Sequence, residues 1–107
     1  MRLTQLAERQ RVKLCDKALN RDALVDIATV LLLLAGSMRP ILEQCRGLQG
    51  AEHQVDTAFG ALATTRTDLL WISGNESASE KTIRQRLWTA GETVQSTFDV
   101  IQTCCRS

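Results

Sequence analysis

The stretch LVDIATVLLLLAGSM, residues 24–38, decides the fold of this chain. It carries no charge from Ile27 to Met38, and its four consecutive leucines would place leucine on every side of a helix. Burying one leucine side chain is worth roughly 1.5–3 kcal/mol, so such a helix needs cover on all sides. The uncharged part spans only roughly 18 Å as a helix, and Asp26 and Arg39 close it at both ends. We therefore expect a buried central helix and not a membrane span.

A first helix is expected before this stretch, over residues 3–19. Asn20 can cap the central helix, because its side chain can accept a hydrogen bond from the first turn. After the apolar run, Gly36, Ser37 and Pro40 predict a kink or break, since proline removes a backbone donor and clashes one turn back. A shorter helical piece over residues 41–46 is expected to follow.

A loop is expected at residues 47–50, and a third helix from about residue 51 to residue 73. Gly74 and Asn75 are expected to end it, and residues 77–80 match a capping box that would start the last helix. Beyond it apolar and small residues keep heptad spacing over three repeats, flanked by a second stripe that holds Trp88 and Phe98. The heptad residues are Ile83, Leu87, Ala90, Val94, Thr97, Ile101 and Cys104.

No run alternates as a half-buried strand does, and the sequence lacks the Asn-Gly and Asp-Gly pairs of tight hairpins. The fold class predicted is all-α: an antiparallel bundle of three to four helices in a single domain over residues 1–107.

The charges are unevenly distributed, although the net charge is only +1. Residues 1–21 hold six basic groups against two acidic ones, which fits the solvated face of a helix or a surface that guides a partner. No secretory signal is apparent, so a cytoplasmic location is expected, with the cysteines as free thiols. A redox role for Cys104 and Cys105 stays open.

Catalytic and cofactor signatures are not found. His53 lies near Glu52 and Asp56, but the Glu-x-x-His spacing of a di-iron bundle is absent, and no glycine-rich loop could hold a phosphate. The cysteine spacing fits no zinc site. We expect no enzyme activity, no cofactor and no metal.

The apolar helix surface exceeds what one small core can hide, which predicts a surface for self-association or for a protein partner. The alternative is that the bundle absorbs all of it. Aromatic residues dominate binding hot spots, so Trp88 and Phe98 are the expected anchors. The complete set of candidate partner-binding residues is Trp88, Val94, Phe98, Ile101, Leu31 and Leu34.

In its size, helical pattern and apolar helix faces the chain resembles the small bacterial quorum-sensing anti-activators of the QslA type. The resemblance implies binding to the ligand-binding domain of a LuxR-type transcription factor such as LasR, with loss of that factor's dimerisation and DNA binding. A homodimer is also expected, without direct contact to nucleic acid or membrane. Two alternatives stay open: a helical secretion chaperone or phage accessory protein, and a small DNA-binding protein.

Overall fold

Four helices make up the part of the chain that the computed structural model describes, which is residues 3–16, 18–44, 49–71 and 80–104. They are α1 (Leu3–Lys13), α2 (Arg21–Gln44), α3 (Gln49–Trp71) and α4 (Glu80–Cys104). These residues include no strand. The predicted all-α bundle is confirmed.

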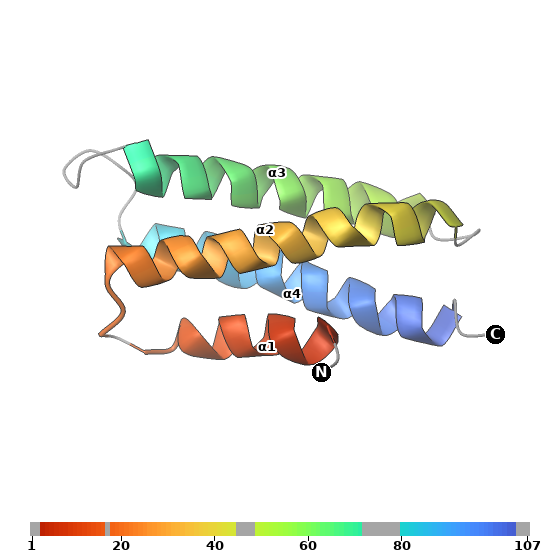
Figure 1. Cartoon of the computed structure of the whole chain (residues 1–107), viewed down its shortest axis with the longest axis horizontal. Helices are drawn as coiled ribbons and strands as arrows, with labels where there is room; N and C mark the ends of the chain where they lie inside the picture. Colours follow the sequence, from red (N-terminus) through yellow and green to blue (C-terminus); the bar gives the residue numbers. More distant parts are fainter. Residues whose placement is uncertain (1–2, 17, 45–48, 72–79, 105–107) are drawn as a thin grey trace.

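Each helix runs antiparallel to the one before it, so the chain goes back and forth along the long axis of the molecule (Figure 1). The helix α2 contacts all three others, and α4 does the same. Within the described residues α1 and α3 do not meet, because they lie on opposite sides of the α2–α4 pair. The short helix α1 lies along only part of α4, and the longer α3 matches α2 in length (Figure 1).

The core is formed mainly by one side of α2 and the heptad face of α4. Buried residues of α2 are Leu24, Ile27, Ala28, Leu31, Leu34, Ala35, Met38 and Leu42, which recur every three or four residues. Six of the seven predicted heptad residues of α4, from Ile83 to Ile101, are buried as well. The side chain of the seventh, Cys104, lies outside the described residues. The heptad interpretation of α4 is confirmed.

The first helix ends at Lys13, six residues earlier than predicted. Backbone amides of residues 14–16 donate to carbonyls three residues back, which is the hydrogen-bond pattern of a 3₁₀ turn. Asp16 then accepts a 2.9 Å hydrogen bond from the backbone amide of Ala18, a local bond that competes with helix continuation. At the start of α2, Asn20 accepts a 2.8 Å bond from the amide of Ala23, so the predicted cap is confirmed.

The helix α2 continues through Pro40 to Gln44, so of the kink or break expected between Gly36 and Pro40 the break is wrong. Met38 and Leu42 lie on either side of the proline and are 0% and 4% exposed. Pro40 itself is on the exposed side of the helix. Burial of these two large side chains outweighs a proline penalty of about 3 kcal/mol.

The third helix matches its prediction to within two residues at each end. Gln49 and Gly50 belong to α3 and not to the expected loop, whose other residues, 47 and 48, lie outside the described part of the chain. The expected helix stop at residues 74–75 and the start of the capping box, residues 77–79, also lie outside it.

Candidate partner-binding surface

Five of the six candidate partner-binding residues lie in the core of the bundle. Leu31 and Val94 are 0% exposed, and the largest exposure among the five is 8%. These five are Leu31, Leu34, Val94, Phe98 and Ile101, and together they belong to one hydrophobic cluster. Only Trp88 is partly on the surface, at 38%. Phe98, expected to anchor a partner, therefore packs inside its own chain in the closed bundle.

Exposed large apolar side chains lie on all four helices, and one of them is on the outer side of α2. Leu33 is 68% exposed, the highest value among the large apolar side chains that the structure describes. Val30 and Leu32 beside it are only partly buried. The bundle therefore covers one side of α2 and leaves the other open, so the expected cover on all sides is not completed by the described part of this chain.

The open side follows from helix geometry. Residues 26, 30, 33, 37 and 40 are three or four positions apart, so they share one side of α2. This side is opposite the buried residues that contact α3 and α4, and no helix of the described chain lies over it (Figure 1). We call the uncharged part of this side, residues 30, 33, 37 and 40, the α2 outer face.

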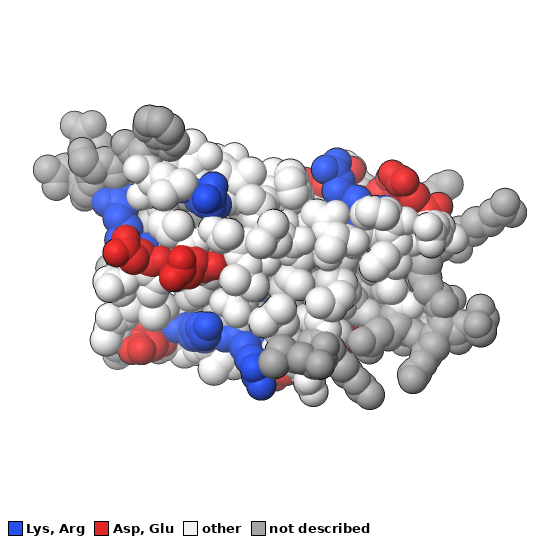
Figure 2. Space-filling model, in the orientation of Figure 1, with Lys and Arg blue, Asp and Glu red and all other residues white. Residues whose placement is uncertain are grey.

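Charged residues lie at both ends of the α2 outer face. Figure 2 shows a largely uncharged middle region on this side of the molecule, with acidic and basic groups toward its ends. At one end Asp22 and Asp26 are exposed. At the other end Arg39 forms a 3.0 Å ion pair with Asp56 of α3. An apolar centre with a charged rim is the usual composition of a protein-binding patch.

A second cluster joins α1 to α4 around Trp88. The Arg11 guanidinium lies over the Trp88 ring, with Cζ 4.2 Å from the ring centroid. Arg11 also donates a 2.7 Å hydrogen bond to Gln95 and lies 3.6 Å from a carboxylate oxygen of Glu92. The exposed predicted anchor is thus already engaged by the chain's own first helix.

Gly91 allows this contact to be close. A Cβ atom at Gly91 would come within 2.9 Å of Arg11 Cγ and 3.3 Å of Leu31 Cδ1. The helices α1, α2 and α4 therefore meet at this glycine. A side chain here would force the side chain of Arg11, or the helix that carries it, to shift.

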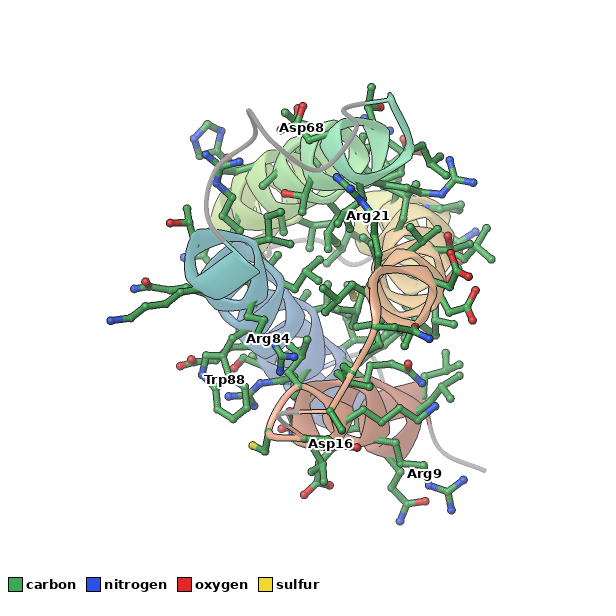
Figure 3. All side chains as sticks on the ribbon, turned by 90° about the vertical axis from the view of Figure 1, so that its left-hand side faces the viewer. Arg9, Asp16, Arg21, Asp68, Arg84 and Trp88 are labelled. Atoms are coloured by element: carbon green, nitrogen blue, oxygen red, sulfur yellow. The ribbon has the colours of Figure 1, made fainter. Side chains whose placement is uncertain are left out.

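Arg84 holds the segment between α1 and α2 in place. Its guanidinium donates to the carbonyl oxygens of Leu14 (3.0 Å), Asp16 (2.8 Å) and Leu19 (3.4 Å). Figure 3 shows Arg84 and Trp88 projecting from α4 on the side where α1 and Asp16 lie. On the other side of the bundle, Arg21 donates to the carbonyl oxygen of Leu69, in the last turn of α3.

A shallow groove of about 410 Å³ lies between α3 and α4. Its lining is mostly alanine, threonine and glutamine, with Arg86 as the one charged residue among the described lining residues. Arg86 is 3.6 Å from Asp68 in an ion pair. The same described lining contains no histidine, cysteine or carboxylate, so it offers neither a general base nor a metal ligand of the usual kind.

Catalytic groups do not come together in the described residues. His53 is exposed, and its neighbour Asp56 is paired with Arg39. The described residues contain no cluster of three histidine, cysteine or acidic side chains that could hold a metal. Cys15 is a free, exposed thiol. The other three cysteines, at positions 45, 104 and 105, have side chains outside the described part.

The helix α2 is long and apolar enough to cross a membrane, by length and composition alone. A core helix of a globular protein passes the same test, and α2 contacts every other helix of the bundle. Nothing in the described fold indicates a membrane protein.

Comparison of the chain with protein-family models, with curated proteins and with solved structures finds no match in any of the three. The resemblance to quorum-sensing anti-activators therefore rests on size and helical pattern.

Sequence reasoning identified the apolar run but not which of its leucines stays exposed. The signal was present, because Asp22 and Asp26 are four residues apart and Leu33 lies seven residues after Asp26. A helix side that begins with two aspartates faces solvent. The contacts of Arg11 and Arg84 could not be found in this way, because they join residues 65–84 positions apart.

Proposed function

We propose that this protein is a non-catalytic binding protein whose α2 outer face docks on another protein. The observation that carries the proposal is the exposure of Leu33, 68%, in the middle of an uncharged helix side. A single exposed leucine is ordinary, but this one has Val30 and Pro40 on the same uncharged side of the helix. Burying such a patch against a partner removes apolar surface from water.

The proposed activity is inhibition by stoichiometric binding to the partner protein. A helix face that covers a partner's own interface blocks the partner's assembly without chemical turnover. The partner class proposed is a LuxR-type transcription factor in the cytoplasm, whose dimerisation and DNA binding would be lost. Support for this class is the resemblance in size and helical pattern. In the absence of a partner, the same face is proposed to form a homodimer.

The test is light scattering of the purified chain, alone and mixed with the ligand-binding domain of a LuxR-type regulator. We expect a homodimer alone, and in the mixture a new complex in which the regulator no longer self-associates. Leu33→Lys should abolish both, because a charge would have to be buried at the centre of the contact. Val100→Lys is the matched control, because Val100 is also an exposed apolar residue, at 39%, but lies on α4.

Two results would contradict the proposal: one would contradict the partner class and the other the binding surface. If the wild-type chain stays a homodimer and ignores the regulator, the partner class is wrong and a chaperone or accessory role becomes the better hypothesis. If Leu33→Lys associates as the wild type does, the surface is wrong.

A further inference from the structure

The helix α1 packs along α4 and also contacts α2, and we call the surface of α2 and α4 beneath it the α2–α4 groove. Five of the six predicted partner residues belong to the hydrophobic cluster of the bundle. Arg11 lies level with Trp88, Glu92 and Gln95 of α4. Because α1 runs antiparallel to α4 (Figure 1), Ala7 lies about one turn further along α4, at the level of Val94 and Phe98. Ala7 is 0% exposed and belongs to the same hydrophobic cluster as these two residues. Part of the chain's most apolar surface is thus covered by a helix of 11 residues.

The helix α1 buries less apolar surface than α2 does. Within the helix only Ala7 and Gln10 are buried, whereas α2 buries eight residues, all of them apolar. Leu14 adds one buried leucine just after α1. Leu6 is partly buried against the same core, and Arg11 adds polar contacts to Gln95 and Glu92 of α4.

The interface also contains buried polar atoms whose hydrogen bonds are not made. Thr4 Oγ1 and Arg11 Nε are buried and have no hydrogen-bond partner among the described residues. Such atoms lose their hydration when α1 docks and regain it when α1 leaves. Elements with few buried apolar contacts are those that open locally, below the free energy of global unfolding.

We propose that α1 is a displaceable cover, and that the α2–α4 groove beneath it binds an amphipathic helix of a partner protein in its place. The buried position of Leu31 then agrees with a role in partner binding, because Leu31 lies beside Arg11 at Gly91 and becomes more accessible when α1 leaves. This proposal uses a different surface from the α2 outer face and does not depend on Leu33.

The contacts of α1 specify the partner helix. It carries an alanine-sized residue where Ala7 lies, an arginine four positions later and a leucine three positions after that, as α1 and the following turn do. The arginine is selected by Trp88 and Glu92, because a guanidinium over an indole ring and beside a carboxylate gains both cation–π and ion-pair attraction. The small residue lets the helix lie deep in the groove.

The segment after α1 can serve as the hinge. Residues 14–16 and 18–20 are outside both flanking helices, and Arg84 is the α4 side chain that holds this segment through three carbonyl contacts. Displacement of α1 requires no change within α2, α3 or α4.

The test uses a fluorescent synthetic peptide of residues 1–19 and the full-length chain, with binding followed by fluorescence anisotropy. In wild type the groove is occupied by the chain's own α1, and we expect little binding. In the Ala7→Asp chain the buried charge releases α1, and the peptide should bind at least about tenfold more tightly than to wild type. A peptide with Arg11→Ala should lose most of this binding. A peptide with Val12→Ala should keep it, because Val12 is 62% exposed.

Three results would overturn the proposal. The Ala7→Asp chain could lose its helical circular dichroism, which would make α1 an integral part of the fold. It could stay helical and fail to bind the peptide, which would show that the groove does not accept a helix. Wild type could form a dimer with exchanged α1 helices, which would make a second copy the occupant.

Hydrogen exchange on the unmodified chain gives an independent measurement. Amides of α1 should exchange at least about tenfold faster than the buried amides of α2, through an opening that leaves α2 protected. Arg11→Ala should accelerate exchange in α1 further and leave α2 unchanged. Equal protection of α1 and α2 would contradict a displaceable cover.

Discussion

Arg84 shows how much of this fold depends on single side chains that the sequence does not mark. It looks like one more surface charge of α4, yet its guanidinium contacts three backbone carbonyls of the segment between α1 and α2. We expect Arg84→Ala to lower the free energy of unfolding by about 2 kcal/mol, since hydrogen bonds from a charged donor are worth about 1.5–3 kcal/mol. Urea unfolding followed by circular dichroism measures this. Lys81→Ala, at a position one turn earlier, is the control and should change little.

Two glycines inside helices should respond oppositely to alanine. Gly60 is exposed in the middle of α3, and no described neighbouring atom lies within 4 Å of the place that an alanine Cβ would take. Gly60→Ala should therefore stabilise the chain by about 0.5–1 kcal/mol through helix propensity. At Gly91 the Cβ would lie 2.9 Å from Arg11 Cγ, and overpacking costs about 1–3 kcal/mol. Thermal and urea unfolding of both variants should place Gly91→Ala at least about 1 kcal/mol below Gly60→Ala. Equal stabilities would mean that α1 does not lie against α4 at this glycine.

At the scale of helices, patterns with a clear period were predicted correctly, and of the local signals the Asn20 cap was confirmed but the break at the proline was wrong. The heptad of α4 and the extent of α3 followed from apolar spacing, because burial on one side of a helix leaves a regular trace in sequence. The end of α1 and the path of α2 through Pro40 did not, because each depends on a competition between a local preference and tertiary packing. For the candidate surface, sequence located the apolar helix but the packing of three other helices decided which side stayed open.

Pro40 lowers the stability of the chain by a measurable amount because it lies inside α2. The proline cannot donate to the carbonyl of Gly36 and its ring crowds that turn, yet the helix is held by its buried neighbours. Pro40→Ala should therefore stabilise the chain by about 1–3 kcal/mol, less than the full helix penalty because proline also restricts the unfolded chain. Differential scanning calorimetry would show this as a higher melting temperature. An unchanged or lower melting temperature would mean that the proline-containing turn is not strained.

At the scale of the whole molecule, substitutions in the buried core should lower the free energy of unfolding, whereas a substitution of the exposed Leu33 on the α2 outer face should hardly change it. Phe98 is 3% exposed and Leu33 is 68% exposed, although the sequence offers both as apolar residues of a helix. Phe98→Ala should lower the free energy of unfolding by about 3–5 kcal/mol, because it leaves a cavity among α1, α2 and α4. A loss of this size is a large part of the stability of a 107-residue chain.

Leu33→Lys should change the stability of the monomer by less than about 0.5 kcal/mol, since it is a surface substitution.

Urea unfolding at low protein concentration, where a homodimer would dissociate, measures both variants on the same scale. The comparison decides between two descriptions of the apolar excess in this sequence. If both variants are destabilised alike, the bundle uses Leu33 for its own folding and the open side of α2 is part of the core. If only Phe98→Ala is destabilised, the leucine contributes nothing to folding that lysine does not, and its apolar side chain is free to contact a partner.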